Sequence, residues 1–129
     1  MGDSDDRSQF DREVLLLACL AKLFTYAQSR GYALTAGEGK ILTPRKGADG
    51  VLRQDGEHML GSLHYLGLAQ DLNLFVKKNG VWTYVSDGGD PAWADLGVYW
   101  ESLDPLCRWG GRFQTRDDNH VSIAYQGRA

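Results

Sequence analysis

The sequence has 129 residues, of which 43% are hydrophobic and 24% charged, and its formal net charge is −3. This composition is typical of one globular domain and excludes a wholly disordered chain, while the lack of a basic excess argues against nucleic acid as a partner. The longest apolar run, residues 14–20, is too short for a membrane span, so we expect no membrane insertion. We also expect a monomer.

The N-terminal part of the chain predicts one long amphipathic helix. Residues 1–7 are polar and are expected to form a disordered tail. From Ser8 onward apolar residues recur at helical spacing as far as Gly31, a natural helix stop. We expect the following stripe to face the core: Phe10, Val14, Leu17, Leu20, Phe24 and Ala27.

The central part of the chain predicts β-structure next to a long loop. Residues 32–42 suggest a short strand, and residues 43–58 are rich in glycine and charge with little periodicity, which is typical of a functional loop. Residues 67–85 alternate between apolar and other residues around the turn Lys78-Asn79-Gly80, and this pattern predicts a β-hairpin.

The C-terminal part predicts a second helix and a closing strand. Asp90 followed by Pro91 is a good helix start, and residues 104–113 read as a loop before a strand at 120–125. This order of elements predicts an α+β fold with a small antiparallel sheet flanked by helices, in a single domain covering residues 1–129. Cys19 and Cys107 favour two buried free thiols over a disulfide.

Two polar residues, His64 and Asp71, interrupt the apolar stretch 61–75. Burying either without a partner costs roughly 1–3 kcal/mol or more, so water, a neighbouring side chain or a metal ion must compensate them. On one unbroken strand they would point to opposite faces, because seven is an odd spacing. We therefore expect His64 on a turn that Gly67 allows to fold back over a strand carrying Asp71.

A second polar pair, Asp117 and His120, stands before the closing strand. Two imidazoles and one carboxylate form a plausible ligand set for catalytic zinc, with the fourth position left for water. Asp117 could then accept a proton from that water. Spacing alone leaves the alternative open, namely that His64 is an ordinary loop histidine, Asp71 caps a turn and His120 pairs with a nearby aspartate.

Two blocks of the sequence resemble the M15 family of zinc peptidases. The string SLHYLGLAQDLNLF, residues 62–75, matches the signature SxHxxGxAxD at Ser62, His64, Gly67, Ala69 and Asp71. The segment WESLDPLCRWGGRFQTRDDNHVS, residues 100–122, is similar to the second block of the family: a tryptophan-glutamate helix end, a WGG turn and an acidic residue three before the last histidine. The family includes D-alanyl-D-alanine carboxypeptidases and dipeptidases and the L-alanyl-D-glutamate endopeptidases of bacteriophages, of which the short phage enzymes are most similar.

This resemblance implies a metal site and a reaction. It implies that His64, Asp71 and His120 bind Zn2+ and that Asp117 is the general base, with Asp118 a poorer candidate because it lies two residues from the histidine instead of three. It also implies a Hedgehog/DD-peptidase-like fold and hydrolysis of peptidoglycan stem peptides, as by an L-alanyl-D-glutamate endopeptidase of the phage endolysin type. The alternative is a non-catalytic cell-wall or virion-associated module that retains the fold.

One departure from the family concerns substrate binding. Relatives often carry an arginine after a Gly-Glu pair, where it holds a carbonyl or carboxylate of the substrate. Here Gly37-Glu38 is followed by GKILTPRKG, so the counterpart is Lys40, Arg45 or absent. Lysine is a point charge and lacks the bidentate geometry of arginine, so the exchange would change substrate affinity.

Further expectations concern location and two residues of the second block. The acidic leader carries no recognisable export signal, so we expect synthesis in the cytoplasm and action on the cell wall after release, or on a virion. We expect Trp109 to pack beneath the site, with the alternative that it forms one wall of the cleft. Glu101 is expected to be a solvated helix end, with the alternative that it accepts a hydrogen bond from a ligand histidine.

Overall fold

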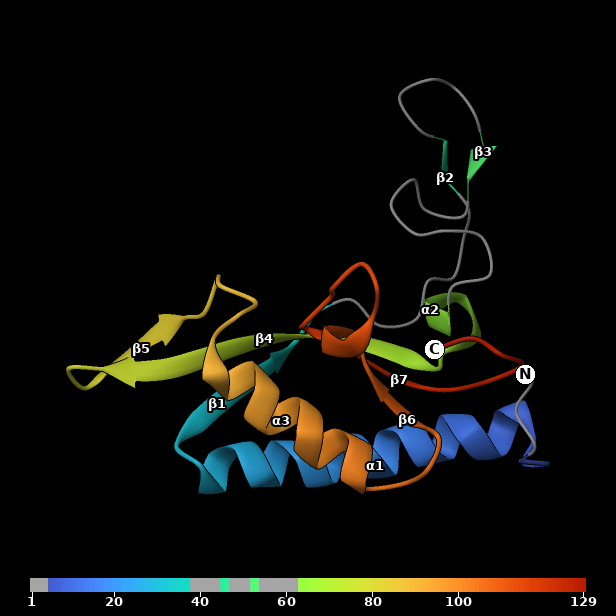
Figure 1. Cartoon of the computed structure of the whole chain (residues 1–129), viewed down its shortest axis with the longest axis horizontal. Coiled ribbons are helices and arrows are strands. Elements are labelled where there is room, and N and C mark those ends of the chain that lie inside the picture. The colour runs from blue at the N-terminus through green and yellow to red at the C-terminus, as the bar shows by residue number, and fades with distance from the viewer. Residues whose placement is uncertain (1–4, 38–44, 47–51, 54–62) are drawn as a thin grey trace.

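The computed structural model describes residues 5–37, 45–46, 52–53 and 63–129, and the structural statements below concern these residues. Two long helices, α1 (Gln9–Ser29) and α3 (Pro91–Ser102), lie along one face of an antiparallel sheet (Figure 1). The short helix α2 (Leu63–Leu66) packs against the strand that follows it, and the 3-10 turn η1 (Gly110–Arg112) contacts α3. The predicted α+β class with a small antiparallel sheet is confirmed.

Five strands form the sheet, in the order β1-β4-β7-β6, with β5 pairing to β4. They are β1 (Tyr32–Ala36), β4 (Ala69–Lys78), β5 (Val81–Tyr84), β6 (Cys107–Trp109) and β7 (His120–Ile123). Every pairing is antiparallel, and β4 is the central strand because β1 lies on one side of it and both β5 and β7 on the other. The predicted loop 43–58 contains a separate pair of short strands, β2 (Arg45–Lys46) and β3 (Leu52–Arg53), and the rest of that loop lies outside the described residues.

Helix α1 has the predicted bounds but not the predicted orientation. Ser8 and Asp11 form a capping box at its start, and Gly31 follows its end with φ +80°. Three members of the predicted core stripe, Phe10, Val14 and Leu17, are 72%, 53% and 69% exposed, so that part of the prediction is wrong. The helix is apolar on two sides, and the buried side is instead formed by Leu16, Cys19, Leu20, Leu23 and Ala27.

The N-terminal segment is held to the domain from Asp5 onward. Arg7 donates from Nη1 and Nη2 to the two carboxylate oxygens of Asp104, at 3.0 and 2.9 Å, and also pairs with Asp5. Residues 5–7 therefore differ from the disordered tail that their polarity predicts, because Asp104, distant in sequence, supplies the partner. Residues 1–4 lie outside the described part of the chain.

The predicted β-hairpin is confirmed as β4 and β5. Asn79 and Gly80 both have positive φ, +53° and +77°, as a two-residue type I′ turn requires. Along β4, Leu72 and Leu74 are buried against the helices, so the odd-numbered residues point to the opposite face. This alternation directs Asp71 away from the core.

Helix α3 and the segment after it bring the second block of the sequence to the sheet. Asp90 caps the helix by accepting from the Ala92 N–H at 2.9 Å, as predicted. The predicted loop 104–113 is wrong in part, because it contains β6 and η1. Cys107 lies on β6 with its Sγ 3.8 Å from that of Cys19, and both thiols are buried and free, as expected. None of the described helices is long and apolar enough to cross a membrane.

Candidate metal centre

Three side chains from different elements meet on the face of the sheet opposite the helices. His64 comes from α2, Asp71 from β4 and His120 from β7. Asp71 and His120 are direct partners across the β4–β7 pair, so the sheet itself sets their distance. Gly67, with φ +72°, reverses the chain after α2 and lets His64 fold back over β4. The convergence predicted from the sequence is confirmed.

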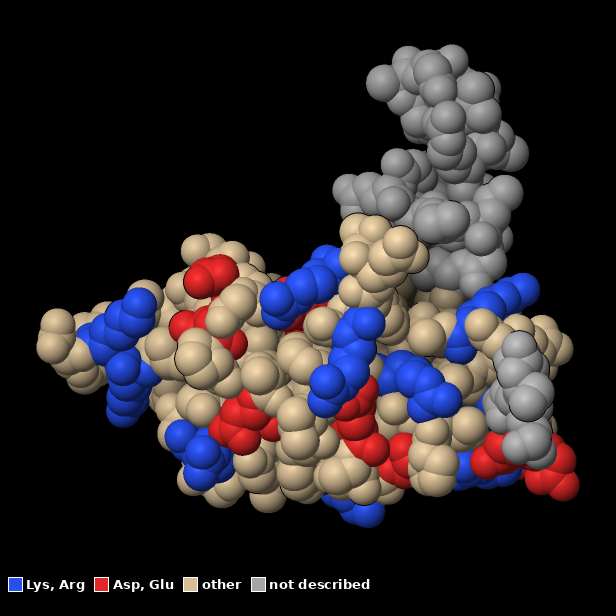
Figure 2. Space-filling view, viewed as in Figure 1, with Lys and Arg blue, Asp and Glu red and all other residues tan. Residues whose placement is uncertain are grey.

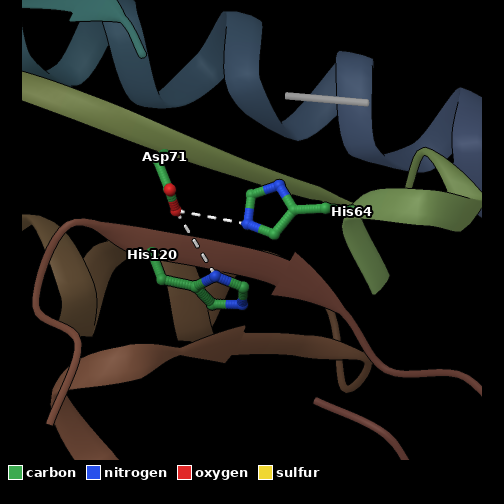
Figure 3. Close-up of side chains that lie close together, drawn as sticks. All are labelled: His64, Asp71 and His120. Atoms are coloured by element: carbon green, nitrogen blue, oxygen red, sulfur yellow. Dashed lines mark ion pairs between the residues drawn. The ribbon is translucent and has the colours of Figure 1, made fainter. Parts of the chain in front are cut away.

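The donor atoms of these residues face one another (Figure 3). The distance from Asp71 Oδ1 to His64 Nε2 is 3.4 Å, and to His120 Nδ1 it is 3.5 Å. Both are longer than the usual 2.7–3.2 Å of an N–H···O hydrogen bond. A zinc ion with ligands at about 2.1 Å in a tetrahedron requires ligand–ligand distances of about 3.4 Å. Two of the three donor–donor distances therefore match this tetrahedron, and all three donor atoms lie within 4.8 Å of one another, as a shared cation requires.

The polar atoms at this site are buried. His64 is 2% exposed and His120 6%, and Asp71 Oδ1 has no hydrogen-bond partner among the described residues. A buried acceptor without a partner costs on the order of 1–3 kcal/mol, so a native fold rarely keeps one without a reason. A cation bound between the three donors would satisfy this oxygen. The residues present therefore fit a metal ion.

The Asp71 carboxyl is ionised at neutral pH. Burial by itself would raise its pKa, but the two facing imidazoles, His120 and His64, outweigh burial and hold the pKa at about 2, below the ordinary 3.8. An ionised carboxylate is the form that ligates a metal. The site thus offers one negative charge and two imidazole nitrogens.

Asp117 lies at the open side of this group. Its Oδ2 is 3.8 Å from His120 Nδ1, and its side chain is 51% exposed. The neighbouring Asp118 has a side chain only 11% exposed and pairs with Arg116. Asp117 is therefore the carboxylate that stands beside the cluster while remaining accessible to solvent, as its position in the sequence predicts.

The WGG turn fixes the segment that carries Asp117. The Asp117 N–H donates to the Gly110 carbonyl at 3.0 Å, and Trp109 Nε1 donates to the Asp118 carbonyl at 2.7 Å. A Cβ at Gly110 would overlap the Asp117 carbonyl oxygen, so only glycine allows this close approach. Trp109 is buried in the core at 6% exposure, in agreement with its expected packing role.

Two further residues, Glu101 and Phe113, lie near the site. Glu101 pairs with Arg112 at 2.8 Å and does not contact a ligand histidine in the described structure, which agrees with a role at the helix end. Phe113 was not singled out in the sequence, yet its ring centroid lies 5.3 Å from that of His120. The only sequence signal for it is an aromatic residue directly after the WGGR turn.

The position of the substrate-binding basic residue stays a prediction. Gly37, the start of the relevant segment, donates its N–H to the Asp71 carbonyl at 2.8 Å, so this segment starts beside the site. Lys40 lies outside the described residues. Arg45 belongs to β2, but its side chain lies outside the described part of the structure. Ser62 of the signature also lies outside the described residues.

The fold and the site together define a small α+β protein with a three-ligand candidate metal centre on the open face of its sheet. A family model described as D-alanyl-D-alanine carboxypeptidase, of the M15 peptidases, matches residues 55–123, which is more than half of the chain. The chain belongs to the M15 peptidase family, whose members act on the bacterial cell wall. No curated protein matches the chain significantly.

Proposed function

We propose that this protein is a zinc-dependent peptidase that hydrolyses the stem peptides of peptidoglycan, as an L-alanyl-D-glutamate endopeptidase. The observation that carries the proposal is the meeting of His64, Asp71 and His120 with donor atoms within 4.8 Å of one another, where the two distances of 3.4 and 3.5 Å from Asp71 Oδ1 match two edges of a zinc tetrahedron. Membership of the M15 peptidases supports the same reaction. The choice of the alanyl-glutamate bond is supported by the similarity of both sequence blocks to short phage endopeptidases.

Each ligand has a defined donor atom in this proposal. His64 would bind through Nε2, His120 through Nδ1 and Asp71 through Oδ1, because these are the atoms that face the common centre. When bound, zinc supplies Lewis acidity that lowers the pKa of a bound water and polarises a carbonyl. The three protein ligands leave a fourth position for water and substrate.

Asp117 would handle the proton in this reaction. Its carboxylate accepts a proton from the attacking water, whose oxygen bonds to the scissile carbonyl carbon, and then donates that proton to the amide nitrogen as the C–N bond breaks. The products are a new carboxylate and a new amine, and no covalent enzyme intermediate forms. The exposure of Asp117 supports this role, because substrate must reach it from solvent.

The chemistry of the substrate also bears on where the enzyme acts. We place its action at the cell wall, which it would reach after release from the cytoplasm or as part of a virion. Cell fractionation and mass spectrometry of purified virions would separate these two routes.

Digestion of purified peptidoglycan tests the proposed activity. We expect the zinc-loaded wild type to release new amino termini, identified as glutamate by labelling. Asp117→Asn should bind as much zinc but lose about 10²–10⁴-fold in kcat, because it lacks the proton acceptor. Asp118→Asn, which alters a carboxylate paired with Arg116, should lose less than tenfold.

Two outcomes would contradict this scheme. A wild type that holds one zinc per chain but releases no new amino termini from any peptidoglycan would support the non-catalytic module. A loss in Asp118→Asn as large as that in Asp117→Asn would remove the assignment of Asp117 as base.

A further inference from the structure

The hairpin of β4 and β5 carries an exposed aromatic surface. Tyr84 is 56% exposed and Trp82 48%, and Phe75 packs edge-to-face on Tyr84 with a centroid distance of 5.7 Å. Phe75 and Tyr84 are register partners, and so are Lys77 and Trp82, so these four side chains share one face of the hairpin. We call them the hairpin aromatic face. Contiguous apolar patches on a protein surface can mark a binding site.

This face continues the surface that carries the candidate metal centre. Asp71, Phe75 and Lys77 are odd-numbered residues of one strand, so they point to the same side of β4. At a rise of about 3.3 Å per residue, Phe75 lies roughly 13 Å from Asp71 and Lys77 roughly 20 Å. The hairpin extends away from the centre of the molecule (Figure 1), so these side chains form a track that leads outward from the site.

A polar hollow lies beside Tyr84 of the hairpin and the segment that carries Asp117. It has a volume of about 270 Å³ and is lined by Tyr84 of the hairpin and by Asp117 beside the metal cluster. Ser86 and Arg116 also line it, so its walls offer hydrogen-bonding groups. A molecule with its reacting bond near Asp117 could therefore reach Tyr84 without leaving the surface.

The chemistry of the aromatic face fits a sugar. Indole and phenol rings present flat apolar faces with a polar edge, which suits the C–H faces and the hydroxyl groups of a pyranose. The ammonium group of Lys77 lies 5.0 Å from the centre of the Trp82 ring and adds a hydrogen-bond donor. Basic side chains gather at this end of the molecule (Figure 2, far left), where Lys77 and Lys78 are both exposed.

The expected substrate has a sugar at a matching distance. In peptidoglycan the stem peptide begins with L-alanine, joined through a lactyl group to N-acetylmuramic acid. The scissile carbonyl of that alanine is thus separated from the edge of the sugar by one residue and the lactyl ether, about 7 Å, and the sugar ring with a van der Waals contact to an aromatic side chain extends this to about 13 Å. The first sugar ring would then lie near Phe75 and Tyr84, and the next one near Trp82.

We propose that the hairpin aromatic face is a glycan subsite that binds the N-acetylglucosamine–N-acetylmuramic acid strand of the substrate while the peptide occupies the metal centre. This inference rests on the proposed function for the identity of the substrate. It assigns the direction of binding, because the glycan side of the peptide lies toward β5.

Fluorescence quenching tests this subsite without any catalysis. Trp82 is 48% exposed, whereas Trp93, Trp100 and Trp109 are 5%, 0% and 6% exposed, so acrylamide should quench mainly Trp82. We expect the reduced disaccharide N-acetylglucosaminyl-N-acetylmuramic acid, without peptide, to lower the quenching constant at least twofold. Trp82→Phe should lose the quenchable component and identify the signal.

Kinetics on two substrates provide the second measurement. Trp82→Ala should raise KM about tenfold for disaccharide-linked stem peptide, because one stacking contact is lost. It should leave kcat unchanged. The same variant should cleave the free stem peptide as the wild type does. Val81→Ala is the matched control, because Val81 is 64% exposed on the same strand but faces the other side.

The possible outcomes separate this inference from the proposed function. Protection of Trp82 by the disaccharide in a protein that cuts no peptide would sustain the subsite and overturn the peptidase. Equal KM changes on both substrates, or no protection by saccharide, would overturn the subsite alone. Protection by anionic phospholipid vesicles but not by saccharide would assign this face to a membrane surface instead.

Discussion

Asp95 faces three polar side chains and Asp71 faces two imidazoles, but the distances to these neighbours differ. Asp95 on α3 accepts hydrogen bonds from Tyr26 at 2.6 Å, Tyr32 at 3.0 Å and Arg30 at 2.9 Å. These donors come from α1, from β1 and from the residue after α1, so the carboxylate ties three elements together. Its hydrogen-bonding capacity is used within the protein.

Asp71 has its neighbours at longer distances and on one oxygen. Both imidazole nitrogens lie 3.4–3.5 Å from Oδ1, and that oxygen accepts no hydrogen bond from the described residues. The difference separates a structural carboxylate from a candidate metal ligand. The Asp95 carboxylate is saturated by donors of the fold, whereas Asp71 Oδ1 faces two imidazole nitrogens at distances longer than usual hydrogen bonds.

The largest effect should come from zinc added to variants at these two positions. We expect Zn2+ at about 1,000 times its Kd to raise the free energy of unfolding of the wild type and of Asp95→Asn by about 4 kcal/mol. Asp71→Ala should show almost none of this increase, because it lacks one of the three proposed zinc ligands. Denaturant unfolding with and without zinc, with elemental analysis, measures it. Full zinc occupancy in Asp71→Ala would contradict the assignment of Asp71 as a ligand and remove the contrast with Asp95.

A smaller effect should follow from removing the saturated carboxylate. Asp95→Asn should lower the free energy of unfolding by about 1–2 kcal/mol in metal-free protein, because it keeps the size of the side chain but loses charge-assisted hydrogen bonds. Tyr26→Phe, which removes one donor, should cost about 1 kcal/mol or less. Zinc content should be unchanged in both, and a drop in either would show that the two regions are coupled.

The smallest effect concerns pH. Burial would raise the pKa of Asp95, but hydrogen bonds from Tyr26, Arg30 and Tyr32 outweigh burial and lower it below the usual 3.8. The folded state therefore binds its proton at lower pH than the unfolded state does, so the stabilisation is complete above about pH 5 and is lost as the pH falls through the folded pKa.

Urea unfolding of the wild type and Asp95→Asn at several pH values checks this effect. The difference between their free energies of unfolding should be constant between pH 5 and 7 and shrink toward pH 3. A difference that stays the same down to pH 3 would show that Asp95 stabilises the fold by packing alone.

The sequence predicted the fold well where local signals decide it. The Asn79-Gly80 turn and the Asp90 cap both act over a few residues, and both elements formed as expected. Helix α1 has apolar residues on two sides, and periodicity cannot say which side meets the sheet. Phe10 and Leu17 were assigned to the core for this reason, although they are exposed. Strand β6 was missed because three residues paired with a distant strand leave no pattern.

The candidate site was predictable only through its motif. Spacing left His64 and Asp71 as an open question, and the SxHxxGxAxD pattern resolved which polar residues should converge. The Asp95 network was not predicted at all, because Tyr26, Tyr32 and Asp95 come from three elements whose packing the sequence does not encode locally. Phe113 was missed in the same way, since its contact with His120 depends on the path of the turn between them.

The pairing of Asp71 with His120 across β4 and β7 has a consequence for folding. These residues are about fifty positions apart, so an ion held by both would close a large chain loop and act as a reversible cross-link. Only a chain whose last strand has docked could hold that cross-link. Metal binding would then report on completed folding, and a truncated or partly folded chain would lack the metal ion that the proposed hydrolysis requires.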